Sequence, residues 1–217
     1  MGAGKVTRAV NAATWSVPAA THDPEAALFI PDEVLAQWAR ATFIEEGAVL
    51  LNTDHAHLRF ANIGFLWTRA EAVRRGHQIL GQAEIFQPRG SPWAKARQAA
   101  QVRSWFGAIP DFLITLDATY CAGAEPAAFC ALVEHELYHC GQAVDAWGLP
   151  RFNKTTGLPA FCIRAHDVEE FVGVVERYGA SAAGESALHL VEATRRGPTL
   201  AAATTQGVCG TCLARAA

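Results

Sequence analysis

The sequence has no long apolar run, although 51% of its residues are hydrophobic. No stretch approaches the roughly 18 consecutive apolar residues of a membrane-spanning helix. The first 25 residues also lack the continuous apolar core of a secretory signal. We therefore expect a protein without a membrane-spanning segment, located in the cytoplasm.

Basic charge is also scarce. The chain has 18 Lys and Arg against 21 Asp and Glu, so its formal net charge is −3. The longest basic runs are the pairs Arg74-Arg75 and Arg195-Arg196. A protein that binds nucleic acid through its phosphates would present a larger basic patch. The composition therefore predicts that nucleic acid is not a partner.

The six cysteines of the sequence do not have the pattern of a disulfide framework. Four of the six lie among apolar residues, where a reduced thiol behaves as a small hydrophobic side chain: Cys121, Cys130, Cys140 and Cys162. The other two form Cys209-Gly-Thr-Cys212 near the C-terminus. One CxxC pair supplies half of a closed zinc site. The alternatives are a metal or redox role and a tail with incidental thiols.

The length of 217 residues suits one sizeable core. We expect a loosely ordered arm at residues 1–25, one domain at residues 26–195, and a C-terminal tail with the CxxC pair at residues 196–217. Apolar periodicity and turn residues predict a mixture of helices and strands. The expected helices are Pro31–Glu46, Thr68–Ile79, Asp167–Tyr178 and one from Ser186 to Arg196. The expected strands are Ala48–Leu51, Ala61–Thr68, Ile79–Gln87 and Asp111–Leu116, with a hairpin between Arg151 and Ile163.

The motif His135-Glu136-Leu137-Tyr138-His139 is the most informative part of the sequence. Pro126 is placed to begin a helix, and apolar residues then recur every three or four positions. On such a helix, His135 and His139 lie one turn apart on the same face with Glu136 beside them. Two imidazoles and a carboxylate in this arrangement can hold zinc and supply the general base of a hydrolase.

A third ligand is needed, because catalytic zinc usually has three protein ligands and one open position. Downstream, His166, Glu169 and Glu170 would lie on the face opposite the apolar stripe of the predicted helix. Imidazole suits zinc, which favours His166. Glu169 and Glu170 remain alternatives, and Asp167 is a candidate to orient an imidazole. The segment Asp54-His55-Ala56-His57 is better explained as a polar connection than as a second metal site.

The motifs HELYH and HDVEEF together resemble the phage metallopeptidases, small zincin-like proteins of phages and prophages, over roughly residues 45 to 180. The resemblance implies an α+β, zincin-like fold with a small mixed sheet packed on helices that include the HExxH helix. It also implies a Zn2+ cofactor and a protein or peptide substrate bound along an edge strand. The residues expected in that edge strand are Phe112, Leu113, Ile114, Thr115 and Leu116.

Two functions remain open at this point. The first is a zinc metallopeptidase in which Glu136 is the general base for the water that attacks a peptide bond. The second is a non-catalytic protein with the zincin scaffold that grips a host or regulatory protein through its edge strand. A scaffold without catalytic duty has no need of Glu136, so the motif favours the enzyme.

Overall fold

The structure is a computed structural model. It describes residues 16–23, 26–74, 76–168, 175, 179–180, 185–203 and 208–213. Within this part of the chain, no helix combines the length and the apolar character of a membrane span. The expected N-terminal arm, residues 1–25, lies largely outside the described residues.

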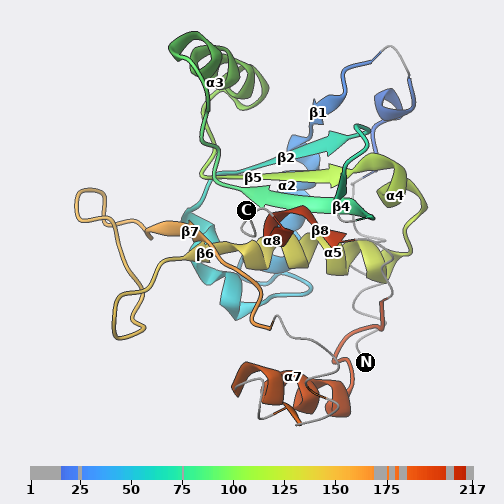
Figure 1. Cartoon of the computed structure of the whole chain (residues 1–217), viewed down its shortest axis with the longest axis vertical. Helices are drawn as coiled ribbons and strands as arrows, with labels where there is room; N and C mark the ends of the chain where they lie inside the picture. The colour runs from blue at the N-terminus through green and yellow to red at the C-terminus, as the bar shows by residue number, and fades with distance from the viewer. Residues whose placement is uncertain are drawn as a thin grey trace.

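A mixed sheet forms the centre of the molecule (Figure 1). Its strand order is β1-β2-β5-β4-β3, and β8 also pairs with β4. Strands β2 and β5 are parallel, β4 is antiparallel to β5, and β8 is parallel to β4. The bounds are β1 Phe29–Pro31, β2 Ile63–Thr68, β3 Val73–Arg74, β4 His77–Glu84, β5 Phe112–Asp117 and β8 Val208–Cys209.

Helices surround the sheet, and a small two-stranded sheet extends from one of them (Figure 1). The HExxH motif ends α5, Pro126–His139, which is followed directly by β6, Cys140–Gln142, paired with β7, Phe161–Ile163. The remaining helical elements are η1 Ala19–His22, α2 Glu33–Ala39, η2 Arg40–Ile44, η3 Thr53–Phe60, α3 Pro92–Phe106, α4 Ala118–Gly123, α7 Glu185–Arg196 and α8 Gly210–Leu213. In Figure 1, α3 projects from one end of the sheet and α7 lies apart from it.

The hydrophobic core joins the sheet to α5 and α2. The ring of Trp67 on β2 stacks on Phe129 of α5 with 6.3 Å between centroids, and Trp38 of α2 contacts the same Phe129 at 5.3 Å. Ile114 and Leu116 of β5 are fully buried beside them. Because burial of large apolar side chains is the main source of stability, this contact fixes α5 against the sheet.

Most of the predicted elements occur. The structure has helix α2–η2, strands β2, β4 and β5, helix α5 and helix α7 where the sequence predicts them. Two predictions were wrong. Residues 48–51 do not form a strand, and residues 49 and 50 form a turn. The predicted helix from Thr68 to Ile79 is instead the β3–β4 hairpin, whose turn uses Gly76 at φ 80°. The predicted helix at residues 167–178 lies mostly outside the described residues.

The expected edge strand requires a correction. The segment Phe112, Leu113, Ile114, Thr115 and Leu116 does form a strand, β5, but this strand pairs with β2 on one side and β4 on the other. It is therefore an interior strand and cannot accept an added peptide. The apolar character of the segment, which suggested a strand, reflects burial on both faces of the sheet.

We expect proline at position 114 to prevent folding. Ile114 is buried and lies opposite Phe65 on β2 and Ala83 on β4, so its main-chain N–H faces a partner strand. Proline removes that donor and is found essentially only on edge strands. Circular dichroism of Ile114→Pro should show no cooperative unfolding. Ile114→Val keeps the donor and should cost only about 0.5–1.5 kcal/mol. A stably folded Ile114→Pro would restore the edge assignment.

Candidate metal centre

Helix α5 positions the motif residues. Pro126 is at its first turn, and its buried face carries Phe129, Val133 and Leu137, each with no exposed surface. These residues hold the helix against the core, as the apolar periodicity of the sequence predicts. The last turn then presents the half-buried His135 and the buried His139 on one face, while Glu136 is directed towards β4 and is itself fully buried.

Four side chains converge at the end of α5. One ligand atom from each of His135, His139, His166 and Cys209 lies within 4.8 Å of all the others. Nε2 of His135 is 3.2 Å from Nε2 of both His139 and His166, and Sγ of Cys209 is 3.2 Å from Nε2 of His139. Tetrahedral zinc with ordinary bond lengths would hold such atoms roughly 3.3–3.6 Å apart. These three separations are therefore close to those expected of a metal ion held by such donors.

The backbone next to β7 orients one imidazole. Nδ1 of His139 is 2.7 Å from the carbonyl oxygen of Arg164, and the Arg164 N–H donates to the His139 carbonyl at 2.9 Å. When Nδ1 donates to that carbonyl, the Nε2 lone pair points at the cluster, as metal-binding histidines require. The Arg164 guanidinium in turn donates to Asp167 at 2.6 Å. The sequence suggests Asp167 as a residue that orients an imidazole. In the structure Asp167 contacts Arg164, and the carbonyl oxygen of Arg164 contacts the His139 imidazole.

Glu136 lies in a closed environment between α5 and β4. Its Oε2 accepts a hydrogen bond from Thr211 Oγ1 at 3.3 Å, and Cys209 Sγ is 3.9 Å away. Its Oε1 has no hydrogen-bond partner among the described residues. Burial raises the pKa of Glu136 well above its ordinary value, the Cys209 thiol adds to the rise, and Thr211 opposes it. A buried carboxylate with an unused oxygen is suited to proton transfer.

Gly81 of β4 makes room for this carboxylate. A Cβ atom at position 81 would lie 2.7 Å from Glu136 Oε1, which is shorter than van der Waals contact. The sequence contains no signal that relates Gly81 to Glu136, because the two residues meet only when β4 packs on α5.

Cys209 is the site residue that the sequence left undecided. It lies on β8, about 70 residues from the motif. The residues around it in the sequence are compatible with a tail that has incidental thiols as well as with a metal-binding segment. The CxxC pair was the available signal, but only the pairing of β8 with β4 brings Cys209 to the histidines. The side chains of Cys212, Glu169 and Glu170 lie outside the described residues, so the glutamate alternatives for a third ligand stay predictions.

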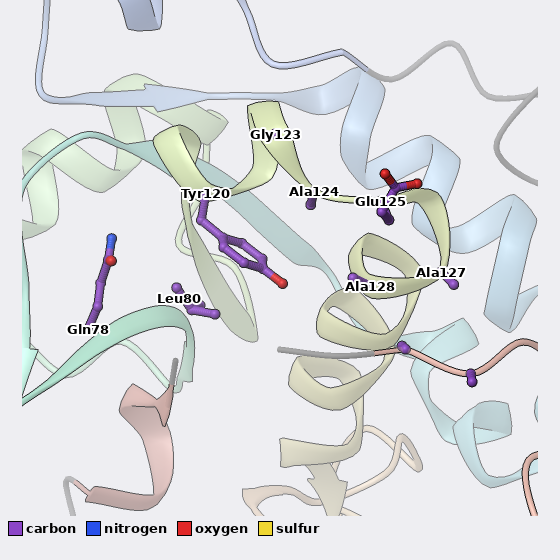
Figure 2. A pocket seen from close by; sticks show the side chains of 10 residues that line it. Gln78, Leu80, Tyr120, Gly123, Ala124, Glu125, Ala127 and Ala128 are labelled. Atoms are coloured by element: carbon purple, nitrogen blue, oxygen red, sulfur yellow. The ribbon is translucent and has the colours of Figure 1, made fainter. Parts of the chain in front are cut away.

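Two cavities adjoin α5. A cleft of about 310 Å3 at its C-terminal end is lined by the three histidines together with Asp54, Tyr138, Arg164 and Asp167. A larger one of about 500 Å3 lies at its N-terminal end, between α4 and β4, where the Tyr120 side chain passes Leu80 and points towards Ala128 (Figure 2). The larger cavity lacks a cluster of metal-binding donors among the described residues. The smaller cleft is therefore the candidate site.

A polar cluster supports the outer wall of the cleft. Asn52 donates to Glu134 and to the hydroxyl of Tyr138, each at 2.8 Å, and that hydroxyl donates to Asp54 at 3.3 Å. The buried ring of His55 packs edge-on against Tyr138 with 4.7 Å between centroids. His57 contacts the Cys140 carbonyl at 2.7 Å. The Asp54–His57 segment thus forms a polar support beside the site, which agrees with the prediction of a polar connection.

We expect His55 to make the protein acid-sensitive. Burial, with the neighbouring His57, lowers the pKa of His55 to about 4, while Asp54 opposes the shift. In the unfolded chain this imidazole takes up a proton near pH 6.5. The free energy of unfolding should therefore fall by about 3 kcal/mol as the pH drops from 6.5 to 4.

The measurement is chemical denaturation at several pH values and equal metal content. His55→Gln should reduce the fall in the free energy of unfolding between pH 6.5 and 4. This holds whether or not the substitution changes the stability at pH 7. The exposed His189 provides the control, and His189→Gln should keep the wild-type pH dependence. An unchanged slope in His55→Gln would contradict the prediction.

Comparison with known proteins gives one result. The sequence profile of the family described as "Putative phage metallopeptidase" matches residues 36–195. The matched range includes α5 and His166 and ends before β8, so Cys209 lies outside it. No curated protein and no solved structure shows a significant match to the chain.

Proposed function

Because the chain belongs to this phage metallopeptidase family, we propose that it is a zinc-dependent peptidase with a zincin-like fold. The family implies a metal ion and a protein or peptide substrate. The observation that carries the proposal is the convergence of His135, His139 and His166 beside the buried carboxylate of Glu136. In this proposal the three histidines hold the metal and Glu136 is the general base.

The donor set favours zinc over harder ions. Imidazole nitrogens and a thiolate suit zinc, whereas magnesium and calcium prefer oxygen ligands. When bound, zinc would polarise the scissile carbonyl and lower the pKa of a water molecule. The Oε1 of Glu136 has no hydrogen-bond partner in the described part of the chain, and this supports the assignment, because a buried carboxylate oxygen without a partner is costly unless a ligand or water uses it.

Other residues of the chain would have separate roles in catalysis and in substrate binding. Glu136 would accept a proton from the attacking water and return it to the amine of the leaving peptide. Arg164 would fix His139 through its carbonyl oxygen. With β5 in the interior of the sheet, β4 becomes the strand on which an extended peptide would align, because it lies directly over α5 and next to Glu136.

One observation favours the alternative of a non-catalytic zincin-scaffold protein. The cluster contains four protein donors, and four protein ligands are typical of structural zinc sites, whereas catalytic sites keep one position open. In that case zinc would stabilise the fold, and the molecule would act by binding a host or regulatory protein.

The two functions are distinguished by metal analysis of the purified protein together with a broad peptide-cleavage screen. The screen compares the wild type with Glu136→Gln. Cleavage that depends on both zinc and Glu136 supports the peptidase. Bound zinc without cleavage in any form of the protein, including forms with an altered Cys209, supports the scaffold.

A further inference from the structure

The outer edge of β4 is covered next to the candidate site. Ile79 lies opposite Val208, and Gly81 lies opposite Cys209, with β8 running parallel to β4. In Figure 1, β8 and the short helix α8 are drawn next to β4 and overlap α5 in this view. This is the edge at which a peptide substrate would have to pair. The residues Val208–Leu213 are called the covering segment below.

Two contacts seat the covering segment on β4. Oγ1 of Thr211 accepts a hydrogen bond from the Ala83 N–H at 2.7 Å and donates to the Ala83 carbonyl at 3.0 Å. Gly210 packs so closely that a Cβ atom there would lie 2.8 Å from Ile79 Cγ2. Thr211 and Gly210 are both buried. The covering segment is therefore held on β4 by specific contacts of Thr211 and Gly210.

The covering segment uses the three features that a peptide substrate would need. Its backbone pairs with β4, its Cys209 sulfur reaches the histidine cluster, and its Thr211 hydroxyl contacts Glu136. A thiolate is a strong zinc ligand and would fill the position that a catalytic site leaves to water. With that position taken and the edge of β4 paired, a peptide could not bind.

The covering segment is also separable from the rest of the sheet. Strand β4 also pairs with β5 along Gly81–Glu84 and with β3 at His77 and Gln78, and these pairings do not involve β8. Strand β8 has only two residues, so main-chain pairing alone would hold it weakly. Release of Cys209 from the metal would therefore free the edge without unfolding the core.

We propose that Cys209 is a fourth protein ligand of the metal and that the covering segment inhibits the site by occupying the place of the substrate. This inference rests on the proposed peptidase function. It makes the chain a latent enzyme, in which displacement of Cys209 exposes the metal, Glu136 and the edge of β4 together. The partner that it predicts is an extended peptide, which competes with the covering segment for β4.

The first test is the absorption spectrum of the full-length protein loaded with cobalt(II) in place of zinc. A thiolate ligand gives a sulfur-to-cobalt charge-transfer band, and imidazoles do not. The wild type should show this band and Cys209→Ser should lose it. Cys212→Ser, a change three residues along the same segment, should keep it. A wild-type spectrum without the band, or loss of the band in Cys212→Ser alone, would overturn the assignment.

The second test measures the affinity of a peptide hydroxamate, which binds zinc and an edge strand together, for zinc-loaded full-length protein. Gly210→Ala places a Cβ atom against Ile79 and should loosen the covering segment while leaving Cys209 in place. The hydroxamate should bind both Gly210→Ala and Cys209→Ser more tightly than the wild type. The gain would be on the order of 100-fold if the closed form holds about 99% of wild-type chains.

The matched control is Gly123→Ala, because a Cβ atom at position 123 meets nothing within 4 Å. Its hydroxamate affinity should equal that of the wild type. Equal affinity in all four proteins would overturn the inference. Tighter binding to Gly210→Ala and Cys209→Ser without cleavage of any peptide would support inhibition by the covering segment and reject the peptidase function. Failure of the inference is therefore distinguishable from failure of the proposed function.

Discussion

Glu136→Gln should lower peptide hydrolysis by roughly 10²–10⁴-fold, the usual cost of removing a general base. The amide keeps the size and hydrogen-bonding capacity of the side chain but cannot accept the proton of the attacking water. Because Glu136 is buried between Gly81 and Thr211, the similar shape should also leave the packing of β4 on α5 intact. Fold and zinc content should remain those of the wild type.

The measurement compares the initial rates of peptide cleavage by the wild type and Glu136→Gln in zinc-loaded samples of the full chain. The comparison is then repeated with Cys209→Ser added to both proteins. Glu134→Gln is the control, because Glu134 lies on the same helix, two residues away, and hydrogen-bonds Asn52 instead of facing the cluster. It should retain the wild-type rate. If Glu136→Gln cleaves as fast as Glu134→Gln, the proposed chemistry is wrong.

The affinity for zinc should fall by different amounts when different residues of the cluster are replaced. Loss of partners that only orient a ligand typically costs 10–100-fold in metal affinity, so removal of a ligand itself should cost about 100-fold or more. We expect this from His135→Ala, His139→Ala and His166→Ala. Cys209→Ser should lose less, because three histidines remain and three protein ligands suffice in catalytic sites.

Affinities are measured by competition with a chromophoric zinc chelator. His57→Gln is the control, because His57 is close to α5 but contacts the Cys140 carbonyl instead of the cluster. The same assay decides the third ligand. If His166→Ala keeps full affinity while Glu169→Gln or Glu170→Gln loses it, that glutamate is the ligand, and His166 becomes the candidate for stabilising the oxyanion.

The sequence was sufficient to predict the motif helix. Pro126 at its start and the apolar spacing from Phe129 to Leu137 are local signals, and the structure contains α5 where they predict it. The positions of His135, Glu136 and His139 relative to one another follow from helix geometry alone. The family could also be inferred, because HELYH and HDVEEF are short continuous motifs, and the profile match confirms the resemblance.

The sequence was misleading where the answer depends on pairing between distant segments. Strand Phe112–Asp117 was recognised from its apolar residues, but the same residues suit an interior strand as well as an edge. Hydrophobicity reports that a segment is buried, whereas the identity of its neighbours is decided by the register of the whole sheet. The β3–β4 hairpin was missed for a related reason, because its turn at Gly76 interrupts a pattern that also suits a helix.

The sequence by itself therefore determined the local chemistry of this protein: two imidazoles and a carboxylate on one helix, and the family to which it belongs. Only the tertiary structure decided that β5 is interior, that β4 lies over Glu136, and that Cys209 joins the histidines. The physical reason is the range of the interactions. Helix periodicity acts over a few residues, whereas the pairing of β8 with β4 joins residues more than a hundred positions apart and leaves no periodic trace in the sequence.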